Sequence, residues 1–237
     1  MNLIGLISPN LTEDTLVDVY KMLPQGTRIE GRALKVGKFT DEEFHRAEQA
    51  FSDLVRDLAR LPLDFLMVTG ELFLSYKGPG SDRQILDLVK KITAVPASTV
   101  LTAVVRGCQA LGLKRVVMAS PFPEDQDEGL VRFLAHDGIA VVAFRGLGCP
   151  NSDAIWALPP ETGYDLATAL LREHPDVDGV YMPCNKWRTV SVLDRIEKDT
   201  GKPVVTNTQA WVWEALRAMG MKQPIPGYGR LLRDPDL

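Results

Sequence analysis

The sequence of 237 residues contains two similar segments, and this internal repeat constrains the fold more than any other feature. Residues 64–70 (Asp-Phe-Leu-Met-Val-Thr-Gly) resemble residues 178–184 (Asp-Gly-Val-Tyr-Met-Pro-Cys). Each segment precedes a helical pattern, a proline that opens a strand, and a second helix ending in Ala-x-Gly-x-Lys. The copies lie about 110 residues apart, which is too long for a solenoid repeat and fits a duplicated α/β domain. All βαβ units look somewhat alike, but the shared helix ending favours duplication.

Short β-branched runs alternate with amphipathic stretches, which indicates an α/β fold with parallel sheets flanked by helices. We expect strands at residues 2–8, 28–36, 64–69, 115–119, 140–144, 178–182 and 203–206. Helices are expected at residues 41–60, 81–92, 99–111, 124–136, 163–172, 189–200 and 209–219. Two sheets should face each other across two lobes. Residues 1–113, with the C-terminal helix and tail at 208–237, form the first lobe, and residues 114–207 form the second.

Composition narrows the class of protein. The net charge of −4 comes with scattered basic residues, which argues against a nucleic-acid partner or an anionic membrane surface. No apolar run approaches the roughly 20 residues of a membrane helix. The apolar start looks like a buried strand and not a signal peptide, so we expect a cytoplasmic protein. Three cysteines without a CxxC pair disfavour a disulfide framework or a zinc site. No nucleotide-binding motif supports a cofactor. The oligomeric state stays open, a homo-oligomer included.

The repeat places Gly70 and Cys184 at matching positions, each just past the carboxyl end of an expected strand. Ligands of open α/β sheets bind at that edge, so two facing edges should enclose a pocket. A turn and then a helix are expected after Cys184, where free N–H groups and the helix dipole would lower the pKa of a thiol. The same N–H groups, beside Asn185, could bind a carboxylate. A small buried hydrophobic residue is the alternative interpretation of Cys184.

Polar residues near the same edge have two interpretations each. Glu71 could be an acid or base, or could turn outward to solvent, and the exposed orientation is commoner for glutamate. Asn10, at the end of the first strand, could orient a carboxylate or cap the next helix. Asn207 lies in a stretch that is interpreted as a helix cap.

Several fragments, taken in order, resemble the aspartate/glutamate racemase superfamily, in the branch of arylmalonate decarboxylase and maleate cis–trans isomerase. The resemblance covers nearly the whole chain. It is carried by the Cys184 turn, Gly70 with Tyr76-Lys77-Gly78, residues 110–116, Leu147-Gly148, residues 201–205 and residues 226–231. It implies two pseudo-symmetric Rossmann-like lobes, a small carboxylic acid bound between them, and no metal or organic cofactor.

The resemblance also implies a single catalytic thiol. Racemases and maleate isomerases of this superfamily carry a cysteine on each lobe, whereas the decarboxylase branch has glycine in the first position, as at Gly70. Two departures stand out. Glu71-Leu72 replaces the Thr-Ser that follows this glycine in the decarboxylase, and Phe122 replaces a tyrosine. Both changes remove donors for a developing enediolate.

These observations favour a cofactor-independent lyase or isomerase acting on the carbon α to a carboxylate. Cys184 would protonate an enediolate after loss of CO₂, or its thiolate would add to a double bond. Glu71 is the second expected catalytic residue, and the expected substrate-binding residues are Pro9, Asn10, Gly70, Leu72, Phe122 and Asn185. A racemase is a further alternative, and a paralogue that binds a small acid without turning it over is a hypothesis of another class.

Overall fold

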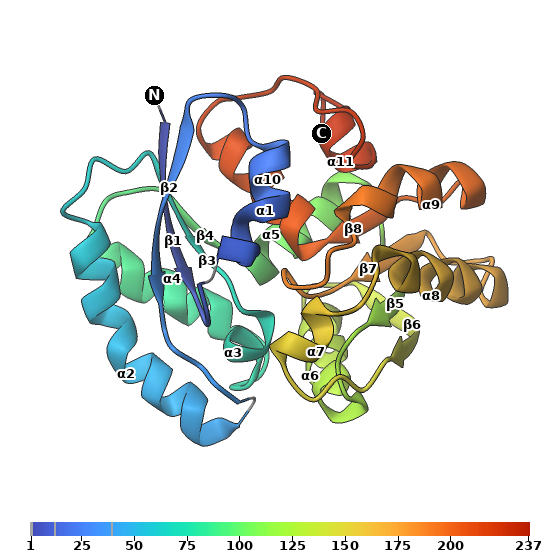
Figure 1. Ribbon diagram of the computed structural model, residues 1–237, viewed down its shortest axis with the longest axis horizontal. Helices are drawn as coiled ribbons and strands as arrows, with labels where there is room; N and C mark the ends of the chain where they lie inside the picture. Colours follow the sequence, from blue (N-terminus) through green and yellow to red (C-terminus); the bar gives the residue numbers. More distant parts are fainter. Residues whose placement is uncertain (1, 12, 39) are drawn as a thin grey trace.

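The computed structural model describes residues 2–11, 13–38 and 40–237, which form two lobes, each built on a four-stranded parallel sheet (Figure 1). The first sheet has the order β2-β1-β3-β4, with β1 (Asn2–Ser8), β2 (Thr27–Ala33), β3 (Phe65–Val68) and β4 (Ala97–Thr99). The second sheet has the order β6-β5-β7-β8, with β5 (Arg115–Ser120), β6 (Ala140–Gly146), β7 (Gly179–Met182) and β8 (Val204–Thr206). The identical strand order confirms the expected pair of parallel sheets.

Helices cover both faces of each sheet, as buried parallel strands require. Those that follow first-sheet strands are α1 (Glu13–Met22), α2 (Asp41–Leu58), α3 (Glu71–Ser75), α4 (Ser81–Ile92) and α5 (Val100–Ala110). Those that follow second-sheet strands are α6 (Glu124–His136), α7 (Ser152–Trp156), α8 (Pro160–Glu173), the 3₁₀ turn Val190–Val192 with α9 (Leu193–Thr200), and α10 (Asn207–Ala218). Figure 1 shows α2 and α4 on one side of the first sheet and α1 on the other.

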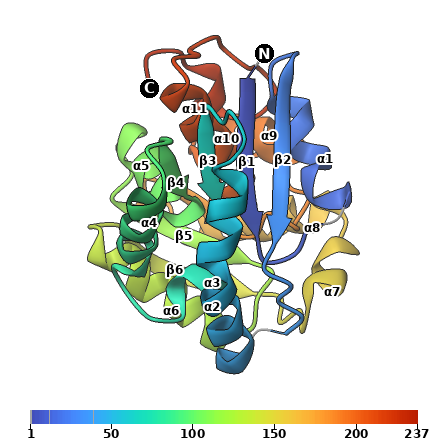
Figure 2. The ribbon, with the colours of Figure 1, turned by 90° about the vertical axis from the view of Figure 1, so that its left-hand side faces the viewer.

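The C-terminal part of the chain ties the lobes together. Helix α10 packs against α5 and α1, and an ion pair joins Arg106 of α5 to Glu214 of α10. The last helix, α11 (Arg230–Arg233), packs against α10 and β8. It is also bonded to α9, where Glu197 accepts hydrogen bonds from the backbone N–H of Arg230 at 2.8 and 3.0 Å. In Figure 2 both termini lie at the same end of the molecule, above the first sheet.

The sequence missed four helices, and each has a physical reason. α3, α7 and α11 have only four or five residues, too few for a 3.6-residue hydrophobic period to show. α1 has ten residues, but its Val17 and Tyr20 are 44% and 49% exposed, which obscures the apolar face.

Candidate active site

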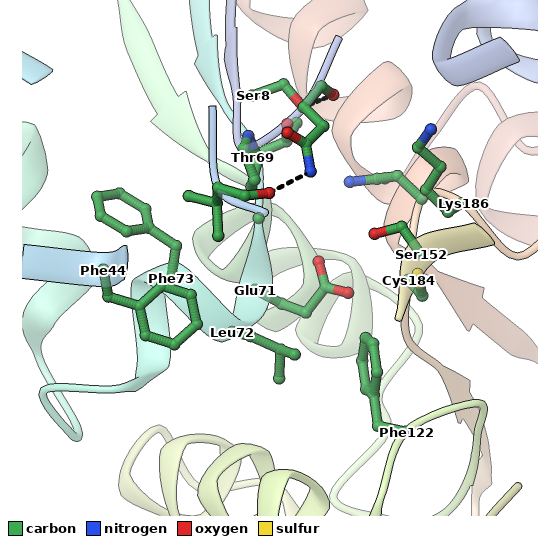
Figure 3. A pocket seen from close by; sticks show the side chains of 15 residues that line it. Ser8, Phe44, Thr69, Glu71, Leu72, Phe73, Phe122, Ser152, Cys184 and Lys186 are labelled. Carbon is green, nitrogen blue, oxygen red and sulfur yellow. Dashed lines mark hydrogen bonds between the residues drawn. The ribbon is translucent and has the colours of Figure 1, made fainter. Parts of the chain in front are cut away.

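A cavity of about 70 Å³, open to solvent, lies between the carboxyl ends of the two sheets (Figure 3). Its walls come from the segments that follow β1, β3, β5 and β7, with single residues from α2, α7 and the segment after β2. The eight predicted site residues all line it: Pro9, Asn10, Gly70, Glu71, Leu72, Phe122, Cys184 and Asn185. The sequence analysis did not select the other seven: Ser8, Val36, Phe44, Thr69, Phe73, Ser152 and Lys186.

Cys184 lies two residues beyond the end of β7, in a left-handed backbone conformation with φ 82°. Residues other than glycine rarely adopt this conformation, and where they do it is often in a strained turn at a functional site. A turn follows, closed by a hydrogen bond of 3.3 Å from the Trp187 N–H to the Cys184 carbonyl, and the 3₁₀ turn that precedes α9 begins only at Val190. The expected contribution of a helix dipole is therefore wrong.

The surroundings of Cys184 oppose the thiolate that the sequence predicts. Burial and the neighbouring negative charge of Glu71 hold the pKa of the Cys184 thiol well above its usual 9.0. Hydrogen bonds from the backbone N–H groups of Lys186 and Trp187, together with the charge of Lys186, act in the opposite direction and are outweighed. These surroundings favour the neutral thiol, which can donate a proton but is a poor nucleophile.

Gly70 occupies the position on the first lobe that matches Cys184, two residues beyond β3, and it precedes α3 with φ 101°. A Cβ atom at Gly70 would lie 2.2 Å from Cγ of Pro9 and 2.7 Å from its Cδ. Both the backbone conformation and the Pro9 side chain therefore favour glycine. A second thiol at this position would require the Pro9 side chain to shift.

Glu71 points into the cavity and is 4% exposed, so the expected outward orientation is wrong. Burial raises the pKa of its carboxyl from 4.5 to about 7, against the lowering effect of its own backbone N–H, of Asn207, and of the Cys184 N–H and thiol. In Figure 3 the Glu71 carboxyl points from α3 across the floor of the cavity toward the second lobe. A carboxyl with a pKa near neutrality and beside a thiol can hold or release a proton at working pH.

Asn207 lies behind Glu71 and does not cap α10. Thr206 is the cap, in a capping box with Gln209. The Asn207 side chain is fully buried and its Oδ1 accepts a hydrogen bond of 2.7 Å from the Tyr181 hydroxyl. Its Nδ2 is near enough to Glu71 to lower the pKa of that carboxyl, but it completes no hydrogen bond with any described residue. The signal in the sequence was ambiguous, because asparagine is also a common cap.

The two sides of the cavity differ in polarity. Lys186 and Ser152 belong to the second lobe and point inward, and Lys186 is the only lysine or arginine among the described lining residues (Figure 3). Phe44, Phe73 and Leu72 form an apolar wall on the first lobe. An anionic group therefore finds its cation on the second lobe, and an apolar substituent finds three apolar side chains on the first. The first lobe also contributes the polar lining residues Ser8, Asn10, Thr69 and Glu71.

Asn10 and Asn185 are both held by neighbours. Asn10 donates through Nδ2 to the carbonyl of Val36 at 2.5 Å, so it braces two loops and does not cap α1 through this group. Asn185 accepts a hydrogen bond of 3.3 Å from the Thr208 hydroxyl through its Oδ1. Lys186 was not predicted to line the cavity. The one signal for it in the sequence was its position two residues after Cys184.

Other chemistry-bearing residues lie elsewhere. Cys108 is fully buried in α5, and Cys149 is buried but does not line the cavity. His45 and His136 are exposed, and no cluster of metal-ligating side chains occurs in residues 2–11, 13–38 and 40–237. Within the same described ranges, no helix has the length and apolar character needed to cross a membrane.

Comparisons with known proteins agree with this geometry. The chain is 29% identical to arylmalonate decarboxylase of Bordetella bronchiseptica over 96% of its length and 95% of the relative, and 25% identical to a maleate isomerase of Pseudomonas putida over 97% and 96%. A liganded double mutant of arylmalonate decarboxylase, glycine to cysteine and cysteine to serine, superposes with a TM-score of 0.90 at 26% identity, covering 98% of this chain and 99% of that one. Maleate cis–trans isomerase of Nocardia farcinica with a bound succinylcysteine intermediate shares the fold, with a TM-score of 0.90 at 20% identity over 98% of both chains.

The sequence profile of the arylmalonate decarboxylase family matches residues 4–232. The chain therefore belongs to the arylmalonate decarboxylase family and is an enzyme of that family.

Proposed function

We propose that this enzyme decarboxylates a malonic acid whose central carbon bears an apolar substituent, and that Cys184 protonates the resulting enediolate from one side. The observation that carries the proposal is the pairing of one neutral thiol with a glycine at the matching position of the other lobe. Protonation of a carbanion needs one acid, whereas two-base racemisation needs a group on each face. The name of the Bordetella relative supports the same reaction class.

The substrate would lie between the polar and the apolar wall. Lys186 and Ser152 can bind the carboxylate that stays, since charge-assisted hydrogen bonds are the strongest available to such a group. The carboxylate that leaves would be directed toward Leu72 and Phe122, where it loses hydration and departs as neutral CO₂. The apolar substituent would contact Phe44 and Phe73. The scarcity of donors at Leu72 and Phe122 favours a substrate other than a simple arylmalonate.

Maleate isomerisation is the second candidate, supported by the similarity to the Pseudomonas putida isomerase. Its addition step needs a thiolate, because the thiol itself is a poor nucleophile. The raised pKa of Cys184 disfavours that step in the resting enzyme. The decarboxylase is therefore the better supported proposal.

A substrate panel separates the two candidates. Purified enzyme is incubated in deuterated water with malonates bearing one aryl or alkyl group and a second small substituent, and with maleate. We expect CO₂ release from at least one malonate, one deuteron at the α carbon, and a single enantiomer. Fumarate formation from maleate without any decarboxylation would reverse the order of the candidates, and racemic product would exclude one-sided protonation.

A further inference from the structure

Four side chains form a buried polar chain that starts at the cavity wall: Cys184 and Glu71 line the cavity, and Asn207 and Tyr181 do not. Tyr181 and Asn207 are completely inaccessible, Glu71 is 4% exposed and Cys184 is 8% exposed. Polar groups buried this deeply cost free energy unless they are paired. Proton donation by Cys184 alone uses only the first member of this chain, which leaves the other three without a role.

The orientation of Asn207 points toward Glu71. Because its Oδ1 accepts the hydrogen bond from Tyr181, its Nδ2 is left for a different neighbour, and Glu71 is the acceptor whose pKa this amide lowers. The matching helix of the other lobe has Val100 at this place, directly after its cap Thr99. The fold therefore accepts an apolar residue here, so the amide is not required by the architecture.

We propose that Glu71 is the proton relay of Cys184, on the same side of the substrate as the thiol, and that Asn207 and Tyr181 are its positioning residues. This inference rests on the decarboxylation proposed above. The enediolate takes the proton of Cys184, so a C–H bond forms and the S–H bond breaks. The thiolate then takes the proton of the Glu71 carboxyl, and Glu71 regains one from water at the cavity mouth. One proton is consumed for each CO₂ released, and no oxidant or reductant is needed.

The relay has a defined electrostatic setting. The Cys184 thiol and backbone N–H lie beside the Glu71 carboxyl, and Lys186 acts on the Cys184 thiol from the same segment after β7. The Tyr181 hydroxyl of β7 is near enough to Glu71 for that carboxylate to raise its pKa. The charges of Cys108 in α5 and Asp127 in α6 also raise the pKa of the Tyr181 hydroxyl. Because the relay must carry its proton to reload the thiol, kcat should fall as pH rises through the Glu71 pKa of about 7.

The first test separates the first turnover from the following ones. In Glu71→Gln, Cys184 still starts with its proton, so one product per active site should form in a burst. Steady-state turnover should then fall by about 10²-fold, and the product should stay a single enantiomer. Glu42→Gln, at an exposed glutamate of α2, is the matched control and should behave as the unmodified enzyme. Loss of the burst together with turnover, or racemic product, would overturn the relay.

The second test concerns the positioning residues. Asn207→Leu removes a group that lowers the pKa of Glu71, so the alkaline limb of kcat against pH should move to higher pH. Tyr181→Phe should move it in the same direction by less, because the amide stays but can rotate. A purely structural role of Asn207 would lower activity at every pH without moving the limb, and that outcome would remove Asn207 from the proposal.

The third test does not depend on turnover. The rate of Cys184 alkylation by iodoacetamide, followed by mass spectrometry against pH, reports thiolate formation. In Glu71→Gln the midpoint should move to lower pH, because a negative charge beside the thiol is lost. An unchanged midpoint would overturn the coupling of the two groups even if the decarboxylase is real. Absence of turnover with every malonate would reject the proposed function, and with it the relay, whereas the alkylation shift alone decides the coupling.

Discussion

The two lobes agree in backbone detail and differ in chemistry. In the first lobe, the N–H of Leu34, after β2, donates to the carbonyl of Ser8, at the end of β1, at 2.8 Å. In the second lobe, the N–H of Leu147, after β6, donates to the carbonyl of Ser120, at the end of β5, at 3.0 Å. The next pairs also match, from Val36 to Pro9 at 3.0 Å and from Cys149 to Pro121 at 2.9 Å. Between them, Lys35 and Gly148 both adopt positive φ.

The side chains at these matched strand ends are unlike one another. At equivalent positions of the two lobes, Gly70 corresponds to Cys184, Glu71 to Asn185, and Asn10 to Phe122. A duplicated fold supplies two equivalent sites around one cavity, and substitution at single positions gives each lobe its own task. The proposed proton donor, Cys184, lies on the second lobe, and Glu71 of the first lobe lines the same cavity. The predictions below alter one lobe so that it becomes more like the other.

The largest effect should come from removing the thiol. Cys184→Ala should lower kcat by about 10²–10⁴-fold, the usual range for loss of a general acid. Cys184→Gly should be equally inactive but more stable than the alanine variant by about 1 kcal/mol, because only glycine adopts positive φ without strain. Turnover assays and thermal unfolding check both statements. Equal stability of the two variants would contradict the strained conformation.

The converse change should fail for steric reasons. Gly70→Cys would give the first lobe its own thiol, but its Cβ meets Pro9 and its φ is 101°. We expect a loss of about 1–3 kcal/mol in the free energy of unfolding, as for other overpacked sites, and no racemase activity. Gly70→Ala should lose a similar amount, and Pro9→Ala in the cysteine variant should restore part of it. Denaturant titration measures all three, and full stability of Gly70→Ala would refute the clash.

A third difference concerns the loops after β1 and β5. Ser8 donates to the carbonyl of Asn10 at 2.9 Å, whereas Ser120 donates to the buried carboxyl of Asp127 at 2.5 Å and accepts from the N–H of Phe122 at 3.0 Å. Burial raises the pKa of Asp127 from 3.8 to about 7, and its other oxygen has no described partner. The folded state thus favours the protonated acid. One oxygen of Asp127 holds the Ser120 hydroxyl, which in turn holds the backbone N–H of Phe122.

The sign of the resulting pH dependence follows directly. A pKa that is higher in the folded state gives stability below pH 3.8, which is lost as pH rises through about 7. Asp127→Asn cannot ionise, so its Tm should fall less between pH 4 and 8 than that of the unmodified enzyme. Glu128→Gln, at an exposed glutamate of the same helix, is the matched control. Parallel Tm curves for Asp127→Asn and the unmodified chain would show that Asp127 does not titrate.

Sequence alone predicted the architecture because it resides in periodic patterns that repeat: the two expected sheets and the Gly70–Cys184 correspondence both come from the same duplicated segment. The failures share a different cause. The orientation of Glu71 and the role of Asn207 depend on which long-range neighbours cover them, and local propensity carries no such information. The raised pKa of Cys184 depends likewise on burial between lobes that a linear pattern does not show.

The smallest predicted effect adds a polar group where the second lobe lacks one. Phe122 is 1% exposed, and its ring faces the cavity near the Glu71 carboxyl in Figure 3. Phe122→Tyr should place a hydroxyl near the developing enediolate, and one hydrogen bond to a charged group is worth about 1.5–3 kcal/mol at best. Because part of that is offset by crowding, we expect at most about a tenfold gain in kcat with aryl-substituted malonates and little change in KM. Phe73→Tyr is the matched control, since it adds the same hydroxyl on the apolar first-lobe wall, where it should give no gain. Equal gains in both variants would mean that polarity alone, and not its place on the second lobe, limits the reaction.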